Sequence, residues 1–237
     1  MFTGRSSQIA GRSSGLPTVA PMREAFHDEL ESVYSDLSAI CGQVKVSVER
    51  ATQALLTGDA TLAEQVITAD ADIDHRRERV EDQAFALLSL QAPVAGDLRM
   101  VVAALRMVSE LERMGDLSVH IAKIARLRVP EVAVPVDQRS TVVRMAQIAE
   151  GMVDKVVRII ADRDTEGPED LRLQEEEMDK LRRSLFTAML GDDWPHGVEA
   201  AVDLALLGRY YERIADHALS VANRIVFVVT GQAAAVS

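Results

Sequence analysis

Acidic side chains recur at the same spacing in two parts of the chain. The stretch LERMGD places Glu112 four residues before Asp116, and YERIAD places Glu212 four residues before Asp216. Residues i and i+4 lie one turn apart on the same face of an α-helix, so each stretch presents two carboxylates together. Neighbouring carboxylates on a largely apolar helix face must be solvated, protonated or bound to a cation. The spacing therefore indicates two candidate cation sites.

A second acidic pair precedes each of these stretches by one predicted helix. DADID occupies 70–74 and EEEMD occupies 175–179. If the two helices of each half pack antiparallel, four carboxylates meet in each half, and carboxylates from facing helices are a known way for bundles to hold metal. Oxygen ligands favour Mg²⁺, Mn²⁺, iron or Ca²⁺. The candidate metal ligands are Asp70, Asp74, Glu112 and Asp116 in the first half, and Glu175, Asp179, Glu212 and Asp216 in the second.

Other interpretations of these carboxylates stay open. Arg113 and Arg213 could neutralise them as ordinary salt bridges, which would make the protein a helical scaffold without metal. The alternative is a metal-dependent phosphohydrolase or a metal-storage bundle, in which the acidic residues bind metal for catalysis or for storage. Against di-iron oxidase chemistry, Gly115 and Ala215 stand where a Glu-x-x-His motif needs histidine. His217 is interpreted as a helix-facing or surface residue. Because the sequence contains no glycine-rich phosphate loop, nucleophile elbow or Cys/His zinc set, we expect no enzymatic activity.

Composition favours close-packed helices and disfavours nucleic-acid binding. Of the 237 residues, 48% are apolar but only 4% are aromatic, and the formal net charge is −11. A surface this acidic repels nucleic acids and anionic lipids. The single cysteine, Cys41, is consistent with a reducing cytoplasm and excludes a disulfide within the chain. The longest uncharged apolar stretch, 83–96, contains Pro93 and is too short to span a membrane, so we expect no membrane insertion.

Apolar periodicity and helix breakers predict an all-α chain of six helices in two groups of three. Pro93, Pro130 and Pro135 interrupt the pattern, as do TGDAT (57–61) and GDDWPHG (191–197). Asp59 or Thr61 is expected to cap the second helix and Gly231 to end the last. The expected helices cover about 24–57, 61–90, 94–127, 138–163, 168–190 and 197–230.

The two groups superimpose, which predicts an internal duplication. Glu112 and Asp116 match Glu212 and Asp216 with an offset of 100 residues, and the preceding acidic pairs match with an offset of 105. Two long antiparallel helices plus a third form a three-helix bundle, so we expect two tandem bundles. The predicted organisation is a disordered N-terminal extension at 1–21, a first repeat at 22–128 and a second repeat at 138–231.

The chain resembles the PhoU family of phosphate-signalling regulators. The likeness rests on LERMGD, YERIAD, DADID, EEEMD and QAPVAGDLR (91–99), and covers residues 22–231. It implies tandem three-helix bundles with metal ions or clusters on the acidic motifs. It also implies a cytoplasmic, homodimeric adaptor that links the ATPase subunit of a phosphate ABC transporter to a two-component sensor histidine kinase. Such a protein keeps phosphate-starvation signalling off when phosphate is plentiful.

The resemblance assigns metal binding to the same eight carboxylates, with divalent or trivalent Mg, Mn, Fe or Zn as the candidate ions. Two departures distinguish the repeats. Ala215 replaces the glycine that the family often has before the aspartate of the motif, which bears on how closely the helices approach there. Glu81 is acidic, as the family tends to be, whereas its repeat counterpart is Phe186, so the two sites need not be equivalent.

Overall fold

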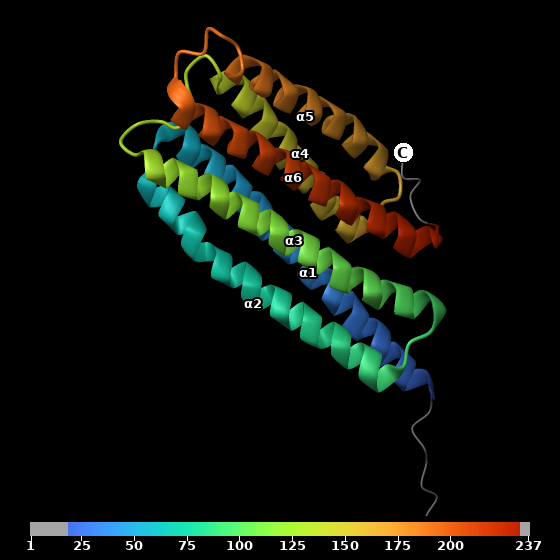
Figure 1. The fold of residues 1–237 in the computed structure, drawn as a ribbon. Helices are drawn as coiled ribbons and strands as arrows, with labels where there is room; N and C mark the ends of the chain where they lie inside the picture. Colours follow the sequence, from blue (N-terminus) through green and yellow to red (C-terminus); the bar gives the residue numbers. More distant parts are fainter. Residues whose placement is uncertain (1–18, 233–237) are drawn as a thin grey trace, which may run out of the picture.

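The computed structural model describes residues 19–232, which form six α-helices joined by short loops (Figure 1). No strand occurs in this range, so the predicted all-α class is confirmed. The helices are α1 (Val19–Thr57), α2 (Ala60–Gln91), α3 (Ala95–Arg128), α4 (Arg139–Asp162), α5 (Gly167–Met189) and α6 (Gly197–Thr230).

The helices form two three-helix bundles packed side by side. α1 packs against α4 and α3 against α6, whereas α2 contacts only α1 and α3, and α5 contacts only α4 and α6, among the described residues. The course of the chain in Figure 1 shows that α1 and α3 run opposite to α4 and α6. Each helix of the interface thus meets its own repeat counterpart. The two tandem bundles predicted from the internal duplication are confirmed, with α2 and α5 on the two outer flanks.

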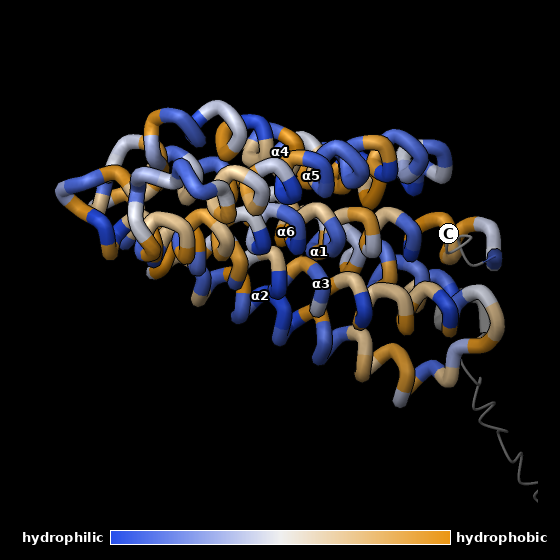
Figure 2. The backbone as a smooth tube through the Cα atoms, turned by 45° about the horizontal axis from the view of Figure 1, so that its top comes forward, coloured by the Kyte–Doolittle hydropathy of each residue, from blue (hydrophilic) through white to orange (hydrophobic). Residues whose placement is uncertain are grey.

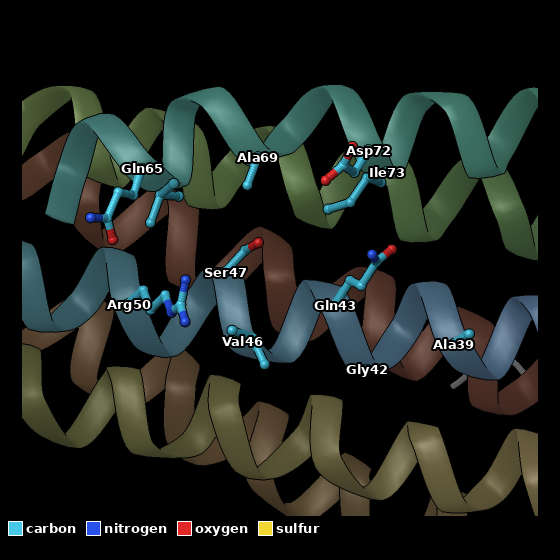
Figure 3. A pocket seen from close by; sticks show the side chains of 11 residues that line it. Ala39, Gly42, Gln43, Val46, Ser47, Arg50, Gln65, Ala69, Asp72 and Ile73 are labelled. Carbon is cyan, nitrogen blue, oxygen red and sulfur yellow. The ribbon is translucent and has the colours of Figure 1, made fainter.

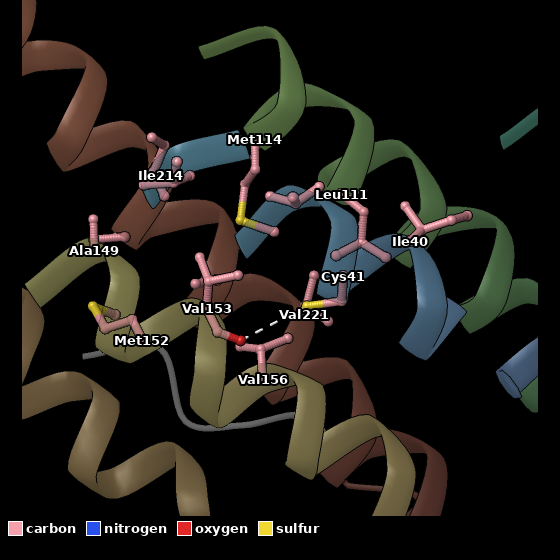
Figure 4. Close-up of a cluster of buried hydrophobic side chains, with 14 of the residues drawn as sticks. Ile40, Cys41, Leu111, Met114, Ala149, Met152, Val153, Val156, Ile214 and Val221 are labelled. Carbon is pink, nitrogen blue, oxygen red and sulfur yellow. Dashed lines mark hydrogen bonds between the residues drawn. The ribbon is translucent and has the colours of Figure 1, made fainter. Parts of the chain in front are cut away.

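A single apolar core joins the bundles. Figure 4 shows Cys41 of α1, Met114 of α3, Val153 of α4 and Ile214 of α6 meeting at the interface between the repeats. The Cys41 thiol lies 3.8 Å from the Val153 carbonyl oxygen and donates to it. Burial raises the pKa of this thiol to about 12, so it stays neutral and acts as a small apolar side chain. The repeats are therefore two halves of one packed unit.

The helix ends follow local sequence chemistry. Asp59 caps α2 by accepting a hydrogen bond from the Leu62 amide at 2.9 Å, and Gly231 ends α6 with φ 75°. α1 begins at Val19, earlier than periodicity predicts, since the first turn of a helix tolerates a residue without an N–H such as Pro21. Of the predicted extension at 1–21, residues 1–18 lie outside the described residues, and the remaining three already belong to α1.

Hydrophilic residues recur along the outer helices α2 and α5, where Figure 2 shows blue segments on both flanks. These helices need only one apolar stripe, because each packs against its own bundle alone. Within residues 19–232, none of the helices is both long enough and apolar enough to cross a membrane.

Candidate functional site

The predicted carboxylates lie on paired helices in each bundle. In the first repeat, Asp70 and Asp74 are on α2 and Glu112 and Asp116 are on α3; we call these four residues the first acidic set. The second acidic set consists of Glu175 and Asp179 on α5 with Glu212 and Asp216 on α6. Because α2 packs against α3 and α5 against α6, each set lies along one helix–helix contact, near the outer flank of its bundle.

Gly115 brings α2 and α3 close together beside the first acidic set. A Cβ at this position would lie 3.2 Å from Ile73 Cδ1 and 3.3 Å from Asp70 Oδ1. Both distances are shorter than ordinary van der Waals contact, so the missing side chain is what lets Asp70 lie against the α3 backbone. The second repeat has a buried Ala215 at the matching position.

Two carboxylates of the first acidic set, Asp70 and Glu112, have raised pKa values. Burial, followed by the negative charges of Asp116, Asp74 and Glu112, raises the pKa of Asp70 to about 6. Burial and the neighbouring Asp116 also raise the pKa of Glu112. Mutual repulsion of this kind is relieved by a proton or by a cation.

Arginine side chains compensate the second acidic set more fully. Glu212 is buried, with 7% of its surface exposed. Its Oε1 lies 3.1 Å from Arg182 Nε, and Arg209 forms an ion pair with its Oε2. The pKa of Glu175 is raised by burial and by Asp216. The pKa of Asp216 is raised by burial and by Glu212, although nearby arginines lower it.

The two sets consequently differ in how well they suit a metal ion. Among the described residues, no group of three or more His, Cys, Asp or Glu side chains converges closely enough to hold one. The first acidic set holds four carboxylates, and the pKa values of Asp70 and Glu112 are raised by burial and by the negative charge of Asp116; a cation beside them would relieve that repulsion. In the second acidic set, the arginines at Glu212 already supply positive charge, so the fit is poorer.

Of the arginines that the sequence suggested, Arg213 pairs with Asp216, but the ion pairs of Glu212 come from other arginines. Arg213 lies 3.7 Å from Asp216, but Glu212 pairs with Arg182 and Arg209 instead. The sequence did indicate that Arg182 has a counterpart in the first repeat, because the 105-residue offset that aligns the acidic pairs also aligns Arg182 with Arg77. Sequence alone did not indicate which carboxylate each guanidinium would reach.

Two further expectations about α6 can be compared with the structure. Val202 and Leu206, on α6 before Glu212, are 51% and 40% exposed, whereas Leu204 and Leu207 in the same turns are buried, so Val202 and Leu206 lie on the solvent side of α6. His217 faces the other repeat, where its Nδ1 donates to Glu110 Oε2 at 2.6 Å and lowers the pKa of Glu110. It therefore joins the repeats and does not complete an acidic set.

A groove of about 340 Å³ lies between α1 and α2 (Figure 3). Its lining includes Gln43, Arg50, Gln65 and Asp72, with Gly42 leaving the α1 wall open. Asp72 is in DADID, but neither Asp70 nor Asp74 lines the groove. The groove is thus separate from the first acidic set.

Comparisons with known proteins place the chain in a family. A family model described as PhoU domain matches residues 37–125 and again 142–225. The phosphate-specific transport system accessory protein PhoU homolog 1 of Mycobacterium leprae is 45% identical over 210 residues, covering 89% of this chain and 95% of that protein. PhoU homolog 2 of Mycobacterium tuberculosis is also 45% identical over 210 residues, covering 89% of this chain and 99% of that protein.

Solved structures agree with the family match. The crystal structure of PhoU from Pseudomonas aeruginosa superimposes with a TM-score of 0.77 at 27% identity, covering 87% of this chain and all of that chain (100%). The PhoU structure from Streptococcus pneumoniae gives 0.78 at 22% identity, covering 89% and 100%, and this likeness supports the fold alone. With the family model matched twice, once in each three-helix bundle, the chain belongs to the PhoU family.

Proposed function

We propose that this protein is a non-enzymatic accessory regulator of phosphate-specific transport. The observation that carries this proposal is the 45% identity, over 89% of the chain, to proteins named as accessory proteins of the phosphate-specific transport system. Its proposed role is to lower phosphate uptake and starvation-gene expression when phosphate is plentiful.

The proposed partners are the ATPase subunit of the phosphate ABC transporter and a two-component sensor histidine kinase. Helical faces dock to each of them, and the protein acts at the cytoplasmic side of the membrane. The long rigid helices and the acidic charge of −11 favour basic partner surfaces over nucleic acid. Homodimer formation remains a prediction.

The acidic sets are the proposed metal sites, with the first set providing the better fit. Asp70 and Asp74 would hold a cation from α2, and Glu112 and Asp116 would hold it from α3. A bound Mg²⁺, Mn²⁺, iron or zinc ion would supply the positive charge that relieves their repulsion. The role of these side chains is to fix α2 against α3, and so to set the shape of the outer flank that a partner meets.

Deletion of the gene tests the regulatory role. In rich phosphate, the deletion strain should express phosphate-uptake and starvation genes, and the wild-type gene should restore repression. Asp116→Asn should repress less well than wild type, whereas Asp82→Asn should repress normally, because Asp82 is exposed on α2 outside the acidic set. Unchanged expression on deletion would refute the proposed role, and so would metal-dependent hydrolysis of phosphate esters by the purified protein.

A further inference from the structure

The contact between the first two helices of each repeat can be compared position by position. With an offset of 105 residues, buried positions of α1 match buried positions of α4, as Val48 matches Val153. Buried positions of α2 match those of α5 with the same offset, as Ile73 matches Met178. The two matches to the family model begin at 37 and 142, which is again this offset. The α1–α2 contact is thus the counterpart of the α4–α5 contact.

In the second repeat, two ion pairs bridge the helices. Arg144 of α4 donates to both carboxylate oxygens of Glu177 on α5, at 2.7 and 2.8 Å. Further along the same contact, Lys155 Nζ lies 3.4 Å from Asp170 Oδ2. The second repeat therefore supplies both charges of each pair from its own helices.

In the first repeat, each matching pair has only one of its two charges. Asp72 is present on α2, but Ala39 stands where the second repeat has the arginine. Arg50 is present on α1, but Gln65 stands where the second repeat has the aspartate. Both charged residues are exposed, and neither forms an ion pair within the part of the chain that the structure describes. One acid and one base are consequently left unpaired along the α1–α2 contact.

The groove of about 340 Å³ between α1 and α2 lies between these two charges. Arg50 and Gln65 line one end of it, and Asp72 lines the other (Figure 3). Between the two ends, Val46 is 42% exposed. The groove thus presents a positive end, an apolar middle and a negative end to the solvent.

The wall of the groove is more polar than the matching surface of the second repeat. Gln43 and Ser47 of α1 point toward α2 (Figure 3), and they match Ile148 and Met152 of α4, which are buried. The Gln43 Oε1 atom accepts no hydrogen bond from the described residues. Because unpaired polar groups make close packing of two helices costly, these residues favour an open groove over a sealed contact.

We propose that this groove docks a helix of a partner protein that presents an acid and a base on one face. The acid would pair with Arg50, the base with Asp72, and an apolar side chain between them would cover Val46. Gln65, at the Arg50 end, and Asp72 are seven residues apart on α2, which is about 10 Å along the helix axis. The acid and the base of the partner should therefore be about two helical turns apart.

A helix is the occupant that this geometry favours. α1 and α2 lie side by side over many turns (Figure 1), and the groove between two such helices accepts the side-chain ridge of a third. The partner would supply the two charges that Arg144 and Asp170 supply within the second repeat. The inference goes beyond the proposed accessory role by naming how one partner is held, and it needs no metal ion.

A photo-reactive residue in the groove tests the inference. Val46 is replaced by p-benzoylphenylalanine in the full-length protein, cells are irradiated in rich and in poor phosphate, and the crosslinked peptide is sequenced. The captured segment should belong to another protein, have helical periodicity, and carry an acid and a base about seven residues apart. Gly151 is the matched control position, because it corresponds to Val46 in the second repeat. The same photo-reactive residue at position 151 should not capture this segment.

The second repeat supplies the variant that should close the groove. Ala39→Arg combined with Gln65→Asp installs both of its ion pairs without changing the net charge. A synthetic peptide that copies the captured segment, followed by fluorescence anisotropy, should bind this variant at least about tenfold more weakly than the wild type. The control Ala86→Arg with Gln53→Asp makes the same substitutions at exposed positions outside the groove and should bind like the wild type. Circular dichroism and the thermal midpoint verify that each variant is folded.

Charge reversal assigns the two contacts. Arg50→Glu should weaken binding of the peptide by about tenfold, because it places like charges together. A peptide whose acid is replaced by lysine should then restore binding to Arg50→Glu. Asp72→Arg and a peptide whose base is replaced by glutamate form the reciprocal pair.

The outcomes separate the docking site from the regulatory role. A captured segment without the acid and the base would overturn the inference, and so would a peptide that binds the closed variant as tightly as the wild type. Capture of a second copy of this chain, or no capture at Val46 beyond that at Gly151, would also overturn it. If the gene-deletion strain represses normally while charge-dependent capture is observed, the docking site stands and the proposed regulatory role fails.

Discussion

Asp70 shows how a single half-buried carboxylate connects folding to pH. It lies against Gly115 and is repelled by three acidic neighbours, and its pKa rises from 3.8 to about 6. When the folded pKa exceeds the unfolded one, the folded state binds the proton more tightly. The stabilisation from that proton is complete below about pH 4 and is lost as the pH rises through 6. At neutral pH, ionised Asp70 therefore destabilises the metal-free protein.

Asp70→Asn should make the metal-free protein more stable at pH 7.5 but not at pH 4. Asparagine has nearly the same shape and cannot ionise, so it removes the repulsion only where Asp70 is charged. We expect a gain of about 1 kcal/mol at pH 7.5, after allowing for solvent screening at this half-buried position. Urea unfolding in the presence of a chelator at both pH values measures it.

Asp72→Asn is the matched control, because Asp72 is exposed on the same helix. It should change stability by no more than a few tenths of a kcal/mol at either pH. An equal gain for Asp70→Asn at both pH values would show that charge repulsion is not the cause.

At the scale of helices, the contact between α2 and α3 depends on one missing side chain. Gly115 is in the middle of α3, where glycine costs about 1 kcal/mol relative to alanine in an unconstrained helix. Glycine at this position must therefore contribute to stability through packing, since a Cβ there would lie 3.2 Å from Ile73 and 3.3 Å from Asp70. Gly151 in α4 has no such neighbour, with nothing within 4 Å of its Cβ position.

Gly115→Ala and Gly151→Ala should consequently change stability in opposite directions. Gly151→Ala should stabilise the protein by about 0.5–1 kcal/mol, as expected for a mid-helix glycine with open space beside it. Gly115→Ala should destabilise it by about 1 kcal/mol, because α2 must shift to accept the methyl group. Thermal and denaturant unfolding compare the two, and a gain in stability for both variants would mean that α2 moves freely.

The helices could be predicted from the sequence, whereas the inequality of the acidic sets could not. Period-3.6 patterning, the Pro93 break and the Asp59 cap are local features, and local features determine where helices occur. The partner of Arg182 depends on how a flexible side chain reaches across two helices once they are packed.

For the molecule as a whole, the shared core predicts cooperative unfolding. Buried residues of α1, α3, α4 and α6 form one cluster across the repeats (Figure 4). Thr52 of α1 and Tyr211 of α6 add a buried hydrogen bond of 2.9 Å between their hydroxyl groups. Neither bundle can lose its packing without exposing the apolar surface of the other. A substitution that destabilises one bundle should therefore lower the free energy of unfolding of both.

Leu87→Ala tests this with the single tryptophan, Trp194, as reporter. Leu87 is buried on α2, which contacts only its own bundle, whereas Trp194 packs in the second repeat. The substitution should cost about 2–5 kcal/mol. It should lower the denaturant midpoint of tryptophan fluorescence by the same amount as that of circular dichroism. A fluorescence midpoint that stays at the wild-type value would show that the repeats unfold separately.

The antiparallel pairing of α1 with α4 and of α3 with α6 has a genetic consequence. Each face meets its own counterpart, as in a two-fold symmetric dimer, but here both partners are encoded in one reading frame. In a true homodimer, one codon change would alter both acidic sets at once. Tandem fusion gives each half its own codon at every matching position, so a mutation can place an arginine beside Glu212 without changing the surroundings of Glu112.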